Sequence, residues 1–391
     1  MSRADGWALA AAITCVCIFA TVGSLVLPAL TLNLESRGES SSLIGIFGAL
    51  LGFAALVGTP FAPWIVRRLG AGAALALLLC VTAVANLSYR LFDDSLAAWF
   101  AIYFVAALAV GLVFVIAETL ITALAPPARR GILLYLYASS FSLGFAVGPV
   151  ILQATGIHGW TPFVVGAALA LSAAALVFAA RIKKSAVPAA MGAGFWRPLL
   201  AAPLPFVCSF ALGAAEMSVY DLLPIYARKL DFPVAAAVFL LTVFSVGTFL
   251  LLSAFGIGTF LLQSLAGGLA EKFDSRIMLA FVSASAVLGA AALPFWLPGA
   301  SAGGEWAKTA YLGIWGGMLM AVYPLGLAQM ARVFPREKLA AANALFGFCY
   351  GGGALCGPAL TGAAMDISPH GIAPALALFA ALPLFALFFR R

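Results

Sequence analysis

Charge is scarce in this sequence. Asp, Glu, Lys and Arg together make up only 9% of the 391 residues, whereas 64% are hydrophobic. Soluble globular domains carry about 25% charged residues. No connection between the apolar runs is long enough to form a soluble domain, which excludes a sensor or scaffold that reports through such a domain. The composition is that of a polytopic membrane protein.

Motifs for ATP hydrolysis and for catalysis are also missing. The chain has no Gly-x-x-x-x-Gly-Lys-Ser/Thr phosphate-binding loop, so it does not power itself with ATP. His158 and His370 are the only histidines, and both lie in predicted outer loops beside glycines. Asp93 and Asp94 are the only adjacent acids, and nothing nearby completes a site. These absences disfavour an integral-membrane enzyme, and no cofactor or resident metal is expected.

The six cysteines give no sign of a disulfide framework, because all of them fall within hydrophobic segments. The simplest interpretation is that they are small buried residues. Cys15, Cys17 and Cys208, together with Met217, are nevertheless soft ligands of the kind that select Cu(I). Neither a Met-x-x-x-Met motif nor an intramembrane histidine accompanies them, so a copper importer is the least favoured of the transport hypotheses.

Long apolar runs fill most of the chain. A helix that crosses a bilayer needs roughly 20 apolar residues. On this basis we predict twelve spans, at 7–33, 43–66, 71–89, 96–123, 132–155, 161–180, 199–227, 234–270, 277–297, 309–331, 339–364 and 372–389. The longest inner connection contains basic residues, two prolines and a Gly/Ala stretch. It divides the chain into an N-terminal six-helix bundle (1–180), a cytoplasmic linker (181–198) and a C-terminal six-helix bundle (199–391).

The basic residues indicate the orientation of the chain. Of the 21 Lys and Arg residues, 16 fall in segments that are inner if the N-terminus is cytoplasmic, and 5 fall in outer ones. This positive-inside signal predicts a multi-pass protein of the bacterial inner membrane with both termini in the cytoplasm. Because the charges occur singly or in pairs, the net charge of +7 does not indicate a nucleic-acid partner. We expect a monomer in the lipid bilayer.

The two halves repeat several features roughly two hundred residues apart, as expected after an internal duplication. The repeated positions are Pro28 and Pro224, the motifs Gly144-x-x-x-Gly148-Pro149 and Gly353-x-x-x-Gly357-Pro358, and the charged turns containing Arg67 and Arg68 in one half and Glu271, Lys272, Asp274 and Arg276 in the other. With these motifs the whole chain resembles the major facilitator superfamily. Ala117-Glu118-Thr119 and Tyr323-Pro324 resemble, more narrowly, the YcaD-like group of bacterial transporters.

The resemblance implies an all-α polytopic membrane protein whose twelve transmembrane helices form two pseudo-symmetric six-helix bundles. It also implies gating roles. The charged turns would latch the inward face, and the Gly-Pro motifs would bend helices where the two halves rock. Helices 1, 4, 7 and 10 would line a central cavity.

Three acids lie inside predicted spans, where burial of a charge is expensive: Glu118, Glu216 and Asp221. A carboxylic acid in a low-dielectric cavity can exchange a proton near neutral pH, so we assign these residues to proton coupling. Glu118 could instead be structural, as a neutral acid that hydrogen-bonds a neighbouring helix. Asp221 could instead be exposed at the outer end of its span, because Arg228 and Lys229 follow closely.

Candidate cavity residues surround these acids in the sequence. Glu216 and Asp221 point about 140° apart on a straight helix. Pro224 cannot donate to the carbonyl of Tyr220, so a bend there could turn both acids inward, and we count Pro224 among the gating residues as a hinge. Aromatic groups near acids suit organic cations through cation–π contacts. The predicted substrate cavity comprises Phe114, Met217, Tyr220, Trp315, Tyr323 and Gln329.

The eighth span, 234–270, is too long for one bilayer crossing and contains an 11-residue tandem repeat, at 239–249 and 250–260. Eleven residues are close to three helical turns, so the repeat keeps the same face inward. We predict a kink or a long protrusion with a break near Gly247 or Gly256. A local duplication without function is the alternative.

These observations predict a proton-coupled secondary active transporter that moves a small molecule by alternating access. Export of a cationic or amphiphilic compound by proton antiport is the first choice, because the interior is acidic and aromatic. Proton symport of a neutral nutrient or vitamin is the alternative.

Overall fold

A computed structural model describes residues 3–124, 130–180, 182, 197–265, 275–297, 304–334 and 336–388. Within these ranges the regular structure is helical, as expected for backbone that must satisfy its hydrogen bonds inside lipid. Ten helices are long and apolar enough to cross a membrane. Two shorter apolar helical segments, Ser139–Thr155 and Val234–Leu250, coincide with the fifth and eighth predicted spans. The predicted set of membrane helices is confirmed.

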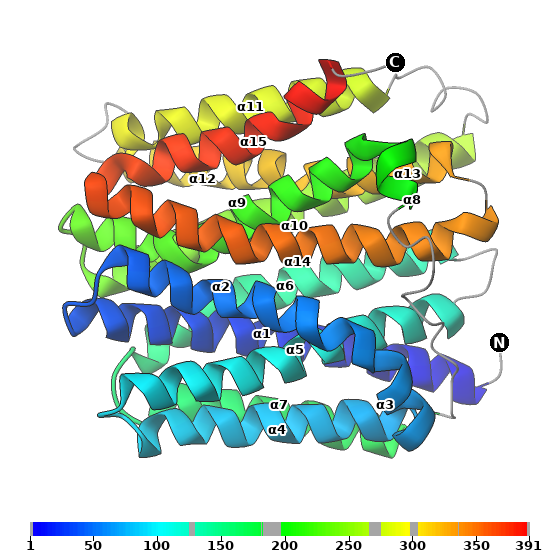
Figure 1. The fold of residues 1–391 in the computed structure, drawn as a ribbon, viewed down its shortest axis with the longest axis horizontal. Helices are drawn as coiled ribbons and strands as arrows, with labels where there is room; N and C mark the ends of the chain where they lie inside the picture. Colours follow the sequence, from blue (N-terminus) through cyan, green and yellow to red (C-terminus); the bar gives the residue numbers. More distant parts are fainter. Residues whose placement is uncertain are drawn as a thin grey trace. The chain divides into compact units, whose positions relative to one another are not determined.

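The described residues of the N-terminal sequence form seven α-helices and a 3-10 turn, η1. Their bounds are α1 Arg3–Ser36, α2 Ser41–Gly58, η1 Thr59–Phe61, α3 Ala62–Leu69, α4 Ala71–Leu91, α5 Leu96–Leu124, α6 Arg130–Thr155 and α7 Thr161–Ala179 (Figure 1). The second predicted span therefore comprises α2, η1 and α3, with prolines at the start of both η1 and α3. Gly70 follows α3 with a φ of 85°, a conformation that favours glycine.

In the part that the structure describes, the C-terminal sequence forms eight α-helices and a 3-10 turn, η3. Their bounds are α8 Arg197–Ala201, α9 Pro203–Lys229, α10 Val234–Leu265, α11 Ser275–Trp296, α12 Gly304–Met320, α13 Val322–Val333, α14 Arg336–Ile367, η3 Pro369–Gly371 and α15 Ile372–Phe388. Ala202 separates α8 from α9 because a residue before proline avoids the helical region; its φ is −152°.

The chain folds as two compact units. The first comprises Met1–Asn33 and Phe53–Ala189, and the second comprises Leu34–Gly52 and Ala190–Arg391. The first part of α2, up to Gly52, thus clusters with the C-terminal helices, a grouping that the sequence does not suggest. The predicted linker 181–198 lies almost entirely outside the described residues, so the predicted domain boundaries stay a prediction.

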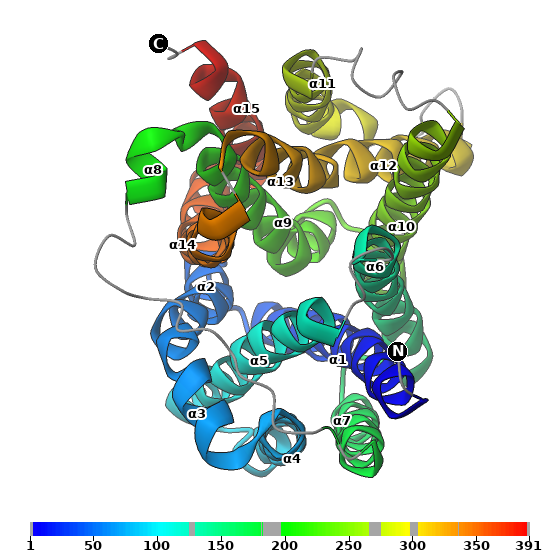
Figure 2. The ribbon, with the colours of Figure 1, turned by 90° about the vertical axis from the view of Figure 1, so that its right-hand side faces the viewer.

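Each unit has its own apolar core. In the first, buried side chains from α1, α3, α4, α5, α6 and α7 form one continuous cluster. In the second, α9 lies among α10, α12, α13, α14 and α15, as Figure 2 shows. Nearly every residue of α9 from Pro205 to Ala227 is buried. A polar side chain on α9 is therefore enclosed by other helices.

Glycines let helices touch backbone to backbone in both units. A Cβ at Gly144 or Gly148 of α6 would overlap α1, and Ser24 on α1 donates to the carbonyl of Gly144 at 3.2 Å. A Cβ at Gly353 or Gly357 of α14 would likewise overlap α9. The two repeated motifs are thus the small-residue faces of two equivalent helix pairs.

The described part of the eighth span shows no interruption of the helix, and the predicted kink or long protrusion stays a prediction. α10 continues as one helix from Val234 to Leu265, past both Gly247 and Gly256. Gly247 has another use, because a Cβ there would overlap the backbone of Gly313 on α12. Close packing of α10 on α12 therefore accounts for a glycine at this position.

Candidate transport site

Glu216 lies at the centre of the second unit. Its side chain is only 3% exposed, midway along α9. The hydroxyl of Tyr350 on α14 donates to Glu216 Oε2 at 2.8 Å. Tyr323 on α13 meets the Tyr350 ring edge-on, with centroids 6.4 Å apart. The structure therefore brings two predicted residues, Glu216 and Tyr323, together through a tyrosine that the sequence analysis did not select.

Asp221 is enclosed more completely than Glu216. It is 0% exposed, and neither carboxyl oxygen has a hydrogen-bond partner among the described residues. The carboxyl group lies against Gly48 of α2, where even a methyl group would overlap it. The alternative of exposure at the outer end of the span is wrong, because α2 covers this position. An ionised carboxylate without a partner is costly in such surroundings, so the group needs a proton or a cation.

Tyr220 and Trp315 belong to a neighbouring cluster. The Tyr220 hydroxyl lies 3.0 Å from Ser245 Oγ on α10, and its ring meets Phe244 edge-on. Trp315 also contacts Phe244, and its Nε1 donates to the carbonyl of Ala286 at 3.0 Å. These two predicted cavity residues are thus buried between α9, α10, α11 and α12. Met217 and Gln329 are buried as well.

Glu118 lies on α5 in the first unit and is partly buried. Phe114, one turn earlier, contacts Tyr137 and Phe141 of α6, with ring centroids 6.4 Å and 5.7 Å apart. The hydroxyl of Thr119 donates back to the carbonyl of Val115, so it is occupied within its own helix. The structure therefore places Glu118 beside an aromatic face shared by α5 and α6.

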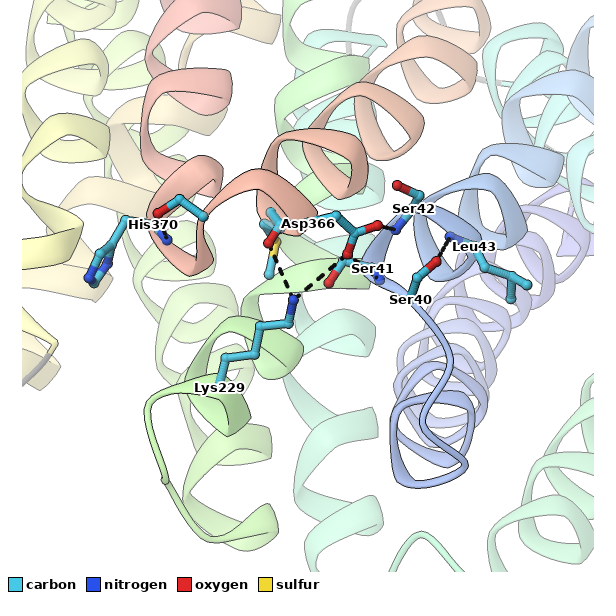
Figure 3. Close-up of polar contacts among 9 residues, drawn as sticks. Ser40, Ser41, Ser42, Leu43, Lys229, Asp366 and His370 are labelled. Atoms are coloured by element: carbon cyan, nitrogen blue, oxygen red, sulfur yellow. Dashed lines mark hydrogen bonds and ion pairs between the residues drawn. The ribbon is translucent and has the colours of Figure 1, made fainter.

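A second polar cluster in the C-terminal unit joins the end of α14 to the start of α2 (Figure 3). Asp366 accepts hydrogen bonds from the backbone N–H groups of Ser41 and Ser42, at 2.8 Å and 2.9 Å. Lys229 at the end of α9 lies 3.9 Å from the same carboxylate. The sequence analysis missed this cluster. Two features of the sequence could have indicated it: an acid, Asp366, at the end of a predicted span, and three consecutive serines at 40–42.

Comparison with known proteins identifies the family. The model of the Major Facilitator Superfamily matches residues 12–252. The chain belongs to this superfamily. The uncharacterized MFS-type transporter YfkF of Bacillus subtilis (strain 168) is 24% identical over 347 residues, which cover 86% of this chain and 83% of YfkF. The protein is therefore a multi-pass membrane transporter and not an enzyme.

Solved structures of the superfamily share the fold. A mutant of the nucleoside transporter NupG superposes with a TM-score of 0.72 at 15% identity, covering 98% of both chains. An inward-facing, unoccupied bacterial homologue of the human lysosomal transporter Spinster gives a TM-score of 0.71 at 14% identity, covering 100% of this chain and 96% of the other. At these identities the likeness establishes the major facilitator fold alone.

The predicted gating residues fall at several places in this superfamily fold. Arg67 and Arg68 are exposed at the end of α3, and the Arg68 guanidinium lies 5.6 Å from the centroid of the Trp64 ring. Arg276 lies in the first turn of α11. Glu271, Lys272 and Asp274 lie outside the described residues.

The three predicted gating prolines lie inside helices that continue past them: Pro149 in α6, Pro224 in α9 and Pro358 in α14. The Gly148 and Gly357 that precede two of them hold these helices close to α1 and α9. A gating role for these residues remains a prediction.

Proposed function

We propose that this superfamily member is a proton-coupled secondary active transporter that works by alternating access. The observation that carries the proposal is Glu216, a buried carboxylate hydrogen-bonded to Tyr350 inside the helix that forms the centre of the second unit. Burying a carboxyl group this deeply is unfavourable for stability. A group whose charge can be neutralised by a proton, and restored when the proton leaves, suits a transport cycle.

Asp221 and Glu118 are the other candidates for proton coupling. Asp221 supports the proposal because its carboxyl group is enclosed without a partner among the described residues. Glu118 supports it as a partly buried acid on α5, which is the fourth predicted span and so one of the four that the resemblance implies line the cavity. A proton moving down its gradient supplies about 2.3 kcal/mol per 100 mV, enough to drive a solute uphill.

Export of a cationic or amphiphilic compound in exchange for protons is the first choice. Tyr323 and Tyr350 meet edge-on beside Glu216, so an aromatic surface adjoins a carboxylate. This combination recognises organic cations through charge and cation–π attraction. A cation and a proton that compete for one carboxylate give antiport directly, because each must leave before the other binds.

Proton symport of a neutral nutrient or vitamin is the second candidate. It is favoured by the hydroxyl groups near the acids, since Tyr220 pairs with Ser245, and Thr361 donates to Ser218 at 2.9 Å. Hydroxyl groups exchange such bonds readily with a polar neutral solute. Copper import stays the least favoured hypothesis, because neither a Met-x-x-x-Met motif nor an intramembrane histidine accompanies the cysteines in the sequence.

We further propose a bacterial inner-membrane protein that has both termini in the cytoplasm and functions as a monomer. The distribution of basic residues, 16 inner against 5 outer, supports this orientation.

The test is a flux screen in proteoliposomes loaded with a pH-sensitive dye. Organic cations, neutral nutrients and metal ions are added one at a time, with and without a proton gradient. Antiport predicts that a transported cation moves protons in the opposite direction, whereas symport predicts movement in the same direction. Glu118→Gln, Glu216→Gln and Asp221→Asn are compared with Glu39→Gln, which removes the same charge outside the spans. A substrate that crosses without any proton movement would refute proton coupling.

A further inference from the structure

The first turn of α2 is capped in an unusual way. The initial backbone N–H groups of a helix have no partner within the helix and must find one elsewhere. Locally, Ser40 supplies one partner, because its Oγ accepts from the N–H of Leu43 at 3.1 Å. The N–H groups of Ser41 and Ser42 instead bond the two carboxylate oxygens of Asp366, 325 and 324 residues away in the sequence. Two of the three caps on α2 therefore come from the end of α14.

The carboxylate of Asp366 is well suited to this position. It carries negative charge to the positive end of the α2 dipole and makes one charge-assisted hydrogen bond with each oxygen. Lys229 approaches it at 3.9 Å and also donates to the carbonyl of Met365 at 3.3 Å. Since the Lys229 and Asp366 side chains are 30% and 32% exposed, their ion pair contributes little, and the cap is the main interaction.

Below this cap, α2 lies on α14 along glycines. A Cβ at Gly45 would overlap the carbonyl of Pro358, and a Cβ at Gly362 would overlap the carbonyl of Ser41. A glycine contact of this kind has few side chains locked across it, so the two helices can separate without repacking a core. The hydrogen bonds from Ser41 and Ser42 to Asp366, at the end of this contact, then favour the arrangement in which α2 stays on α14.

We propose that Asp366 is a latch that holds the outer end of α2 against α14 and opens when α2 moves during transport. The proposal rests on the alternating-access function given above, and it assigns a gating role to a residue outside the repeated motifs. In the latched state Asp366 satisfies Ser41 and Ser42. In the open state water replaces the carboxylate at both N–H groups, which is feasible because Asp366 lies at the accessible end of α14.

A buried reporter on α2 tests this latch without any substrate. Ser41 is 1% exposed, and its hydroxyl has no partner among the described residues, so Ser41→Cys keeps the backbone donor and removes no side-chain bond. The reporter is placed in a chain whose six cysteines are replaced by alanine. Its rate of labelling by a membrane-impermeant thiol reagent is measured in lipid nanodiscs. It is compared between Asp366, Asp366→Asn, Asp366→Ala and the control Asp94→Asn, which removes an exposed acid elsewhere.

The latch predicts slow labelling with Asp366 and an increase of roughly fivefold or more with Asp366→Ala, the factor expected for a lost helix cap. Asp366→Asn, which keeps one acceptor, falls between them, and it carries the test if the alanine variant does not fold. Asp94→Asn labels at the parent rate. Equal rates in all variants, or fast labelling of the parent, would overturn the proposal. Because labelling needs no substrate, a failure of proton coupling in the flux screen leaves this result standing.

Discussion

Gly353→Ala probes the contact between α9 and α14 that positions Glu216. A Cβ at Gly353 would overlap the carbonyl oxygen of Phe210 and lie 2.7 Å from the backbone nitrogen of Ala214. Both obstacles are backbone atoms, so no side chain can rotate away, and the two helices must move apart. Gly347 lies two turns earlier on α14 and has nothing within 4 Å of an added Cβ. Gly347→Ala is therefore a control on the same helix.

The expected difference follows from two opposing terms. Alanine improves helix propensity by roughly 0.5–1 kcal/mol at either position. At Gly353 the overlap costs about 1–3 kcal/mol, the usual penalty for an overpacked core. We therefore expect Gly347→Ala to be neutral or stabilising, and Gly353→Ala to be less stable than this control by about 1–3 kcal/mol. At an unfolding entropy of about 2.1 cal/mol/K per residue, this corresponds for 391 residues to a melting temperature lower by about 1–4 °C.

The assay is thermal unfolding of both variants in one detergent, followed by the intrinsic fluorescence of the eight tryptophans. The two proteins differ only in which glycine of α14 carries the methyl group, so general effects of alanine cancel. Equal melting temperatures would refute backbone contact between α9 and α14 at Gly353. The hydrogen bond between Glu216 and Tyr350 would then lose its structural basis.

Three further changes test individual contacts. Tyr350→Phe removes the hydrogen-bond donor to Glu216, and we expect coupled flux to fall by roughly tenfold, the factor for one lost buried hydrogen bond, with little change in expression. An unchanged flux would show that this hydrogen bond has no part in the transport cycle. Pro224→Ala restores a donor to the carbonyl of Tyr220, so thermal unfolding should show equal or higher stability while transport slows. Transport at the wild-type rate would refute the role of Pro224 as a hinge. Glu35→Gln removes the charge from a partly exposed ion pair with Arg228, 3.7 Å long, so the stability change should stay below about 1 kcal/mol. A larger loss in the same unfolding assay would contradict a weak surface pair.

The helices could be predicted from the sequence because lipid demands long apolar runs. Their internal breaks follow from prolines, which the span prediction did not use. Pro60 and Pro63 accompany the change from α2 to α3, and Pro324 lies in the first turn of α13, where its missing N–H leaves no helical bond unmade. The contact of Gly247 with Gly313 on α12 could not be predicted, because the two glycines are distant in the sequence.

The candidate site was only partly predictable. Glu216 and Asp221 stand out as acids in apolar surroundings, and any reader of the sequence can find them. Tyr350 and Asp366 could not be selected in the same way, since tyrosines inside spans and acids at span ends are common. Their roles depend on how α14 aligns with α9 and α2, and this register is fixed by glycine contacts spread over hundreds of residues.

The central claim is that Glu216 couples protons to substrate movement. The most direct test measures proton flux and substrate flux together in the same proteoliposomes, with a substrate from the screen, for the wild-type protein, Glu216→Gln and Glu39→Gln. We predict that wild type and Glu39→Gln move a fixed number of protons per substrate, and that Glu216→Gln loses this coupled proton movement. If Glu216→Gln carries substrate with the wild-type number of protons, Glu216 is not the coupling residue.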